Sequence, residues 1–118
     1  MIENLNGIHE TVKYKENSNV KLFINAEAED YPIHWHTPME IIMPLEGGYT
    51  VQIGDDLVHL NENDIIFIAS GVKHRLIAPD TGKRLILQIE WSAVSKIKEL
   101  NSILTLIAVS YTHLRAHE

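Results

Sequence analysis

Two short segments carry the side chains best suited to chemistry. The first runs from His34 to Glu40 and holds two histidines and a carboxylate, and the second places His74 shortly after Gly71. Side chains two or four residues apart on an extended strand point the same way, so His34, His36 and Glu40 are predicted to share one side. His74 could complete the set from a neighbouring strand. Three imidazoles and a carboxylate suit a divalent transition metal, and they would equally serve as polar anchors of a small-molecule pocket.

Glu40 is the residue that makes a site most plausible, because it opens an otherwise apolar run ending at Leu45. A buried carboxylate without a partner is strongly destabilised, so Glu40 is expected to face a metal, a histidine or a ligand. One alternative is that Glu40 lies at a strand end and reaches water. Another is that the three histidines and Glu40 only satisfy one another. His9 and His59 have no comparable neighbours and are interpreted as surface or strand-edge residues.

The composition excludes several classes of protein. The 118 residues suffice for one domain with a core, and the absence of cysteine excludes disulfides and thiolate metal sites. No segment approaches the ~20 apolar residues of a membrane span or has the features of a signal peptide, so a cytoplasmic location is expected. The net charge of −6, with scattered lysines, argues against direct nucleic-acid binding by this segment.

The elements that must position the site are predicted to be short strands. Apolar runs are separated by turn signals every eight to twelve residues or so, which is typical of an antiparallel sandwich or barrel. The predicted strands cover residues 11–15, 20–25, 40–45, 49–53, 57–60, 65–68, 74–78 and 84–91. In the last strand one face carries Leu85, Leu87, Ile89 and Trp91, and the other carries Arg84, Gln88 and Glu90.

The apolar period changes after Trp91. Apolar residues then recur every three or four positions, which predicts an amphipathic helix over residues 92–108 with Ser92 as its N-cap. Its apolar stripe would pack on the barrel or pair with a partner's copy. Residues 109–118 resemble the translation of a sequencing-adapter remnant and are expected to be a non-native tail. The expected division is therefore a β-barrel over 1–91, a helix over 92–108 and a tail over 109–118.

The spacing of the histidine segments resembles that of the cupin family. The run His34-x-His36-(x)3-Glu40-(x)6-Gly47 is similar to the first cupin motif, and Gly71-(x)2-His74 is similar to the core of the second. The match covers about residues 20–91. Four turn positions depart from the motifs: Ala28, Asn63, Ala69 and Ala78.

This resemblance implies an all-β fold, the double-stranded β-helix or jelly-roll barrel, followed here by the C-terminal amphipathic helix. It also implies that one ion could be held by His34, His36, Glu40 and His74. The metals that suit such a ligand set are iron, manganese, nickel and zinc.

A narrower resemblance points to the sensor domains of AraC-type transcription regulators. The segments that carry it are residues 31–36, 40–42, 45–47 and 85–91. It implies a cupin-like barrel that binds a small, often sugar-like effector, then dimerisation helices, then a pair of helix-turn-helix units. The chain is accordingly expected to be truncated before its DNA-binding domain. A homodimer is expected for the full-length protein, with DNA contacted only through that missing domain.

Two functions follow from these observations. The preferred one is a non-enzymatic sensor without catalytic residues, whose effector binds at the three histidines and Glu40 and shifts the population between two domain arrangements. The alternative is a small metal-dependent cupin enzyme, such as a dioxygenase or isomerase, with open coordination positions for substrate or oxygen. The sequence offers no further acid–base pair and no nucleophile beside a histidine, which favours the sensor.

Overall fold

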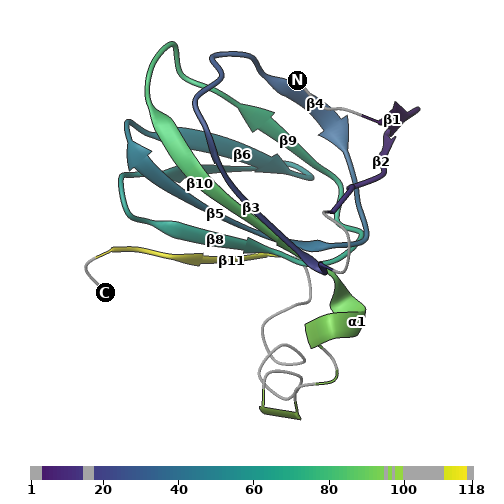
Figure 1. Ribbon diagram of the computed structural model, residues 1–118. Helices are drawn as coiled ribbons and strands as arrows, with labels where there is room; N and C mark the ends of the chain where they lie inside the picture. Colours follow the sequence, from purple (N-terminus) through teal and green to yellow (C-terminus); the bar gives the residue numbers. More distant parts are fainter. Residues whose placement is uncertain (1–3, 15–17, 95, 97, 100–110, 117–118) are drawn as a thin grey trace.

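The computed structural model describes residues 4–14, 18–94, 96, 98–99 and 111–116. Within them the chain is almost entirely β-structure, with one short helix (Figure 1). The elements are β1 (Leu5–Asn6), β2 (His9–Glu10), β3 (Val20–Asn25), β4 (Tyr31–His34), β5 (Met39–Glu46), β6 (Tyr49–Ile53), β7 (Asp56–Leu60), β8 (Ile65–Ile68), β9 (His74–Ile77), β10 (Lys83–Ile89), α1 (Trp91–Val94) and β11 (Tyr111–Leu114).

Two antiparallel sheets face one another and enclose the core (Figure 1). The larger sheet has the strand order β11-β8-β5-β10-β3, and the smaller has the order β4-β9-β6-β7. The buried apolar cluster between them comprises Ile42, Tyr49, Val51, Ile53, Val58, Leu60, Ile66, Ile68, Leu76 and Ile86. Burying these side chains is the main driving force for closing the two sheets on each other. The predicted all-β jelly-roll barrel is confirmed.

Most strands lie where the sequence pattern predicted them. β3, β6 and β8 have the predicted bounds, and β5, β7, β9 and β10 differ by only one or two residues at an end. The strand predicted over residues 11–15 is wrong, because residues 11–14 have no regular structure and residue 15 lies outside the described part. The hairpin of β1 and β2 was not predicted, since strands of two residues are too short to show a period.

β10 alternates as predicted, but its more polar face is the interior one. The buried residues are Arg84, Ile86 and Gln88, while Leu85, Leu87 and Ile89 are half-buried on the outside. Arg84 donates hydrogen bonds to Asn25 Oδ1 at 2.7 Å and to the Glu27 carbonyl oxygen at 2.9 Å. Its guanidinium also lies 4.4 Å from the centre of the Tyr49 ring. These partners compensate for the burial of its charge.

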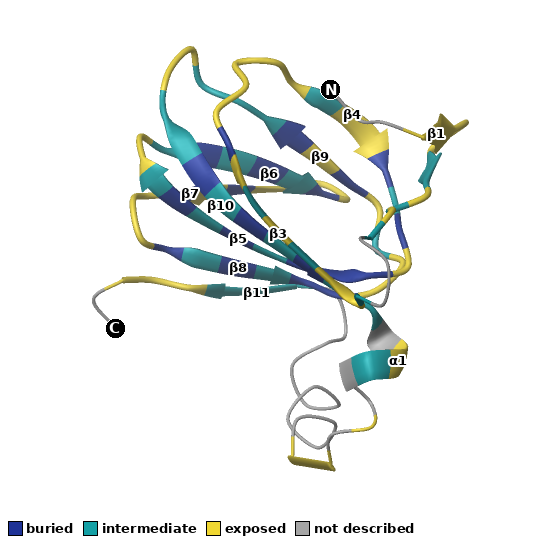
Figure 2. Cartoon of the chain, in the orientation of Figure 1, coloured by how far each residue is buried: buried dark blue, intermediate teal, exposed yellow. Residues whose placement is uncertain are grey.

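The outer face of the larger sheet is apolar across four strands. Leu22, Leu87, Ile41 and Phe67 form one row of cross-strand neighbours. The edge strand β3 exposes Val20 by 46%, Leu22 by 60% and Ile24 by 60% (Figure 2). An exposed apolar surface of this kind is a common site of protein association.

Of the predicted C-terminal helix, the structure describes residues 92–94, 96, 98 and 99. α1 spans Trp91–Val94, while residues 95, 97 and 100–108 lie outside the described part, so the amphipathic helix over 92–108 is not shown. Within the predicted tail, β11 pairs with the edge of β8, and Tyr111 donates a hydrogen bond to Asp56. The non-native origin of residues 109–118 stays a prediction. No helix in the described part has the length and hydropathy needed to cross a bilayer.

Gly82 occupies a turn position that a side chain would not tolerate. Its φ is +109°, and a Cβ atom there would collide with the carbonyl oxygen of Glu46. We expect Gly82→Ala to lower the free energy of unfolding by about 2–3 kcal/mol. Gly54→Ala is the matched control, because Gly54 also has positive φ (+59°) but a Cβ would meet nothing within 4 Å. The control should lose only about 1 kcal/mol. Urea unfolding measures both, and equal losses would contradict the predicted collision.

Candidate functional site

The predicted site residues come from both sheets. β4 ends at His34 and β5 begins at Met39, so the chain passes from the smaller to the larger sheet between them. His36 lies in this passage, and Glu40 is the second residue of β5. The premise of one continuous strand from His34 to Glu40 is therefore wrong. Pro38 accounts for the break, because it lacks an N–H for the ladder and restricts the residue before it.

Three imidazoles nevertheless meet inside the barrel. His34 and His74 are direct cross-strand partners on β4 and β9. The ring centres of His34 and His74 are 4.3 Å apart, those of His36 and His74 5.0 Å, and those of His34 and His36 5.6 Å. One nitrogen of each ring lies within 4.8 Å of the other two, and all three residues are 1% exposed. This group could hold a metal ion.

Backbone carbonyl groups fix the orientation of all three rings. The Nδ1 atom of each histidine lies 2.8 Å from a carbonyl oxygen two residues away in the sequence. Those oxygens belong to Pro32, Pro38 and Val72. A carbonyl oxygen only accepts, so Nδ1 carries the hydrogen, and Nε2 of a neutral ring keeps its lone pair. A ring N–H anchored in this way is the usual support of a metal-binding histidine.

Glu40 lies beside two of the three histidines, and its role as a fourth ligand stays a prediction. Its Oε2 lies 3.2 Å from His74 Nε2, and its Oε1 lies 3.6 Å from His36 Nε2. Two ligand atoms that bind one ion at ~2.1 Å are roughly 3.0–3.4 Å apart for coordination angles of about 90–109°. Glu40 Oε2 and the two Nε2 atoms are buried without an aligned hydrogen bond in the described part of the chain. With the rings neutral, each of these three atoms offers a lone pair, which fits a cation bound between them.

The charges at Glu40 and His36 stabilise each other. Burial alone would raise the pKa of Glu40, but His36 and His74 outweigh it and hold that pKa well below its usual range. Burial also acts to lower the pKa of His36, but the facing Glu40 carboxylate outweighs it, so the pKa of His36 is raised. In the metal-free site these shifts favour a Glu40 carboxylate beside a protonated His36 imidazole. A metal ion would displace that proton, since imidazole binds metals only when neutral.

His34 has the opposite electrostatics. Burial, and after it the proximity of His74, lowers the pKa of His34 to about 4. Its nearest carboxylate is Glu10, whose Oε1 lies 3.7 Å from His34 Nε2. His34 is accordingly neutral at physiological pH and ready to act as a ligand without losing a proton.

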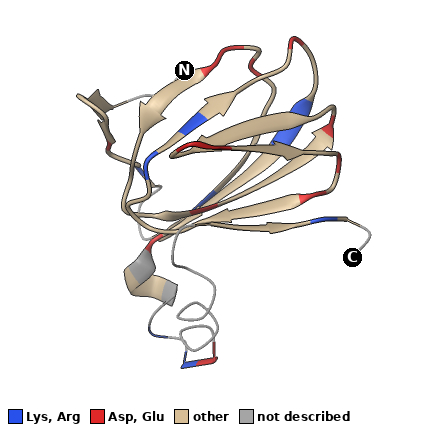
Figure 3. Cartoon of the chain, turned by 180° about the vertical axis from the view of Figure 1, so that it is seen from behind, with Lys and Arg blue, Asp and Glu red and all other residues tan. Residues whose placement is uncertain are grey.

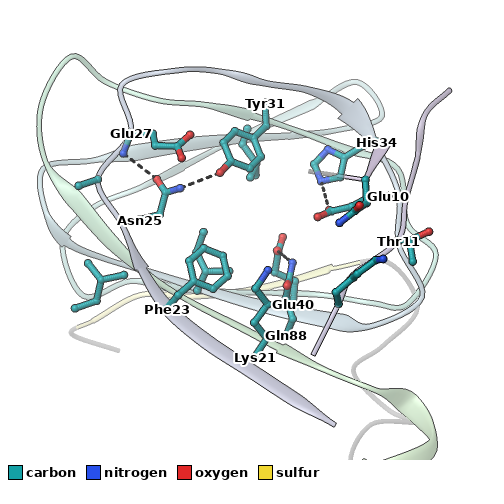
Figure 4. Close-up of a pocket in the computed structure, with 16 residues that line it drawn as sticks. Glu10, Thr11, Lys21, Phe23, Asn25, Glu27, Tyr31, His34, Glu40 and Gln88 are labelled. Carbon is teal, nitrogen blue, oxygen red and sulfur yellow. Dashed lines mark hydrogen bonds and ion pairs between the residues drawn. The ribbon is translucent and has the colours of Figure 1, made fainter. Parts of the chain in front are cut away.

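A cavity of about 330 Å³ opens beside this cluster (Figure 4). Of the predicted ligands, His34 and Glu40 line it. Much of the rest of its lining is also polar, and the residues labelled in Figure 4 include Glu10, Lys21, Asn25, Tyr31 and Gln88. The aromatic ring of Phe23 adds an apolar wall. Such a mixture of a few polar groups and aromatic faces is typical of small-molecule sites.

The sequence analysis singled out only His34 and Glu40 among these lining residues. It missed the others, which include Glu10, Lys21, Phe23, Asn25, Tyr31 and Gln88. Gln88 lies directly across from Glu40 in the register of β5 and β10, and its place on the same face of β10 as Arg84 was the only signal. Glu10 is brought to the cavity by the N-terminal hairpin, where its N–H donates to the Trp35 carbonyl oxygen at 2.9 Å. His9 stacks on the Trp35 ring at 4.2 Å, so it has a partner that the sequence did not reveal.

Comparison with known proteins identifies the family of this chain and a transcriptional regulator to which part of it is similar. Residues 22–89, more than half of the chain, match the family model described as the cupin domain. Over 55 residues the chain is 34% identical to an uncharacterized HTH-type transcriptional regulator, YdeC, of Bacillus subtilis (strain 168). That alignment covers 46% of this chain but only 19% of the regulator.

Solved structures show the same fold at low sequence identity. A cupin-2 domain protein from Shewanella frigidimarina NCIMB 400 is 19% identical with a TM-score of 0.57, over 64% of this chain and 76% of that one. The DMSP lyase of Ruegeria pomeroyi DSS-3 is 24% identical with a TM-score of 0.51, over 61% of this chain and 38% of that one. The family match and the two facing sheets agree: this chain belongs to the cupin domain family.

Proposed function

We propose that this chain is the ligand-sensing domain of an AraC-type transcriptional regulator, with a small sugar-like effector bound in the barrel. The observation that carries the proposal is the polar cavity that opens beside Glu40 inside the barrel. Its volume of about 330 Å³ suits a small molecule. The similarity to an HTH-type regulator supports a sensing role over a purely structural one.

The lining of the cavity has the chemistry that a polyhydroxy ligand requires. Asn25 donates to the Tyr31 hydroxyl oxygen at 3.0 Å, which leaves the Tyr31 hydroxyl hydrogen available for a ligand. Lys21 offers a cationic donor, and Glu10 offers a carboxylate acceptor on the other side. The rings of Phe23 and Tyr31 present faces against which the C–H groups of a sugar ring can pack.

An effector at this place would contact three separate parts of the fold. Glu10 belongs to the N-terminal hairpin, His34 to the smaller sheet and Gln88 to the larger one. A ligand that binds one arrangement of these parts more tightly shifts the population toward it. Gln88 also lies three residues before α1, so the helix predicted over 92–108 would be the nearest element to transmit the change.

The surface of the barrel supports the remaining parts of the proposal. The apolar row on the outside of the larger sheet offers a surface for the predicted helix or for a second copy, consistent with a homodimer. In the described part of the chain, basic side chains are scattered among acidic ones rather than gathered on one face (Figure 3). The proposal therefore gives DNA contact to a C-terminal helix-turn-helix domain and not to the barrel. It also includes a cytoplasmic location.

A second candidate function is favoured by the orientation of the three histidine rings. Their anchored Nδ1 atoms leave three Nε2 lone pairs beside a carboxylate, an arrangement that serves metal-dependent catalysis. Iron, manganese, nickel or zinc at this site would supply a Lewis acid with open coordination positions. The protein would contribute the ligands, the enclosed cavity and the polar groups that orient a substrate.

Thermal unfolding with a panel of pentoses, hexoses and sugar alcohols tests the sensor. One of them is expected to raise the melting temperature, since saturation at 100 times Kd stabilises the folded state by about 2.7 kcal/mol. Tyr31→Phe should weaken that shift, because it removes the hydroxyl donor but keeps the ring. The control is Tyr111→Phe, which removes the hydrogen bond to Asp56 on β7.

A panel without any stabilising carbohydrate would contradict the sugar-like effector. Reading the coding DNA past the codon for Ile107 tests the regulator separately. Two helix-turn-helix units are expected there, and a stop codon in uncontaminated genomic DNA would contradict the assignment.

A further inference from the structure

The side chain of Gln88 is hydrogen-bonded to the candidate metal ligand Glu40. The two residues are cross-strand partners on β10 and β5, and both face the interior of the barrel. Gln88 is 4% exposed, and its Nε2 donates a hydrogen bond to Glu40 Oε1 at 2.9 Å. This is the one hydrogen bond that an uncharged side chain of the described residues gives to the Glu40 carboxylate.

The carboxamide can bind Glu40 in one orientation only. An ionised carboxylate accepts hydrogen bonds but donates none, so the NH₂ side of Gln88 must face it. Oε1 of Gln88 then points the other way, and it is buried without a partner in the described part of the chain. A buried polar atom without a partner is unfavourable, and the neighbouring interior residue of β10, Ile86, is apolar. Packing alone would be served better by an apolar side chain at position 88.

The bond from Gln88 determines how Glu40 meets the histidines. With Oε1 held by Gln88, Oε2 of the same carboxylate lies 3.2 Å from His74 Nε2. Without that bond the carboxyl group would be free to rotate about its last side-chain torsion, which is a broad and weakly restricted one. Residues that orient a metal-ligating carboxylate through a hydrogen bond commonly tune the affinity of the site.

We propose that Gln88 is a positioning residue that holds Glu40 in place as a ligand for a divalent cation bound by His34, His36 and His74. This inference rests on the metal-binding capacity of the site set out under the proposed function. It assigns a role to a residue outside the four ligand positions. Gln88 acts through Glu40 and does not itself touch the ion.

The test measures binding of Co²⁺ to tag-free, metal-free protein by calorimetry and by its visible absorption spectrum. Gln88→Met keeps the length of the side chain but removes the donor, and it should weaken the Kd for Co²⁺ by about 10–100-fold. Its absorption bands should shift toward those of Glu40→Gln, because both variants disturb the same ligand. Gln52→Met is the matched control, since Gln52 on β6 donates to the Gly54 carbonyl oxygen and is not one of the residues around Glu40. It should bind Co²⁺ like the wild type.

The double variant Glu40→Gln/Gln88→Met separates this role from a general loss of structure. If Gln88 acts through Glu40, the double variant binds Co²⁺ no more weakly than Glu40→Gln alone. Gln88→Asn covers the case in which methionine prevents folding, because it keeps the amide but is too short by one methylene to reach Glu40, so the same loss is expected. Additive losses, or an unchanged Kd and spectrum in both Gln88 variants, would overturn the proposal and leave the metal site intact. Wild-type protein that takes up no Co²⁺ would overturn the metal site and, with it, the role of Gln88.

Discussion

Replacing His74 with alanine is expected to abolish tight binding of a divalent metal ion. His74 is the centre of the cluster: its ring lies 4.3 Å from that of His34, and its Nε2 lies 3.2 Å from Glu40 Oε2. The substitution removes one ligand and also separates Glu40 from its closest imidazole. The loss of affinity should therefore exceed the ~10–100-fold that follows from removing a supporting residue.

The measurement is metal content after dialysis, together with calorimetric titration by Ni²⁺, Zn²⁺ and Co²⁺. The protein should carry no affinity tag, because a histidine tag would bind the same ions. His59→Ala is the matched control, since His59 lies on the exposed side of β7 and interacts with Thr50 at 3.1 Å. It should keep wild-type stoichiometry. If His74→Ala retains one tightly bound ion per chain, the three imidazoles do not form the metal site.

Metal uptake should also release a proton wherever His36 is protonated in the metal-free site. His36 carries a raised pKa because Glu40 faces it, whereas His34 is already neutral. The ion must displace the proton of His36 before that ring can act as a ligand. Affinity is therefore expected to rise with pH across the titration of His36. His36 thus stabilises the metal-free site and also makes metal binding depend on pH.

The site could be predicted from sequence to the extent that it depends on spacing along the chain. His34, His36 and Glu40 converge although no single strand carries them, because they are close in sequence and the short passage between the two sheets joins them. His74 could be added because its motif lies on a neighbouring strand. Gln88 could not be assigned a role, because that role depends on the register between β5 and β10, which appears only in three dimensions.

The fold, too, could be predicted where it depends on local sequence signals and not where it depends on contacts between remote segments. Strand positions followed from turn signals that are local in sequence, such as those after Glu46 and Gly54. The sequence did not reveal which face of β10 lies inside, because the partners that accommodate Arg84 (Asn25, the Glu27 carbonyl oxygen and Tyr49) are remote from it in sequence. The N-terminal hairpin is held by hydrogen bonds between Glu10 and Trp35, and between Trp35 and Ile8. Contacts between segments that are remote in sequence leave no periodic signal in either one.

Metal-free protein is expected to lose stability as the pH falls from about 6.5 to 4. The folded state lowers the pKa of His34 from its ordinary 6.5 to about 4, chiefly through burial. Between these values the unfolded chain binds a proton at His34 and the folded chain does not, so acid favours unfolding. The shift corresponds to roughly 3 kcal/mol for a group that is fully buried.

The neighbouring groups act in different pH ranges. Because the pKa of His36 is raised, this residue stabilises the folded state. The stabilisation is complete below about pH 6.5 and is lost only as the pH rises above that value. Because the pKa of Glu40 is lowered, this residue also stabilises the folded state. The stabilisation is present above about pH 4.5 and is lost only in stronger acid. His36 and Glu40 therefore do not weaken the fold between pH 6.5 and 4.5. Burial raises the pKa of Glu10 beside His34, and this favours the folded state as the pH falls, so the comparison with a His34 variant is what isolates His34. Urea unfolding in the presence of EDTA should show this slope in wild-type protein and lose most of it in His34→Gln. An equal slope in both would show that another group causes the acid sensitivity, and that His34 is not the buried neutral imidazole described here.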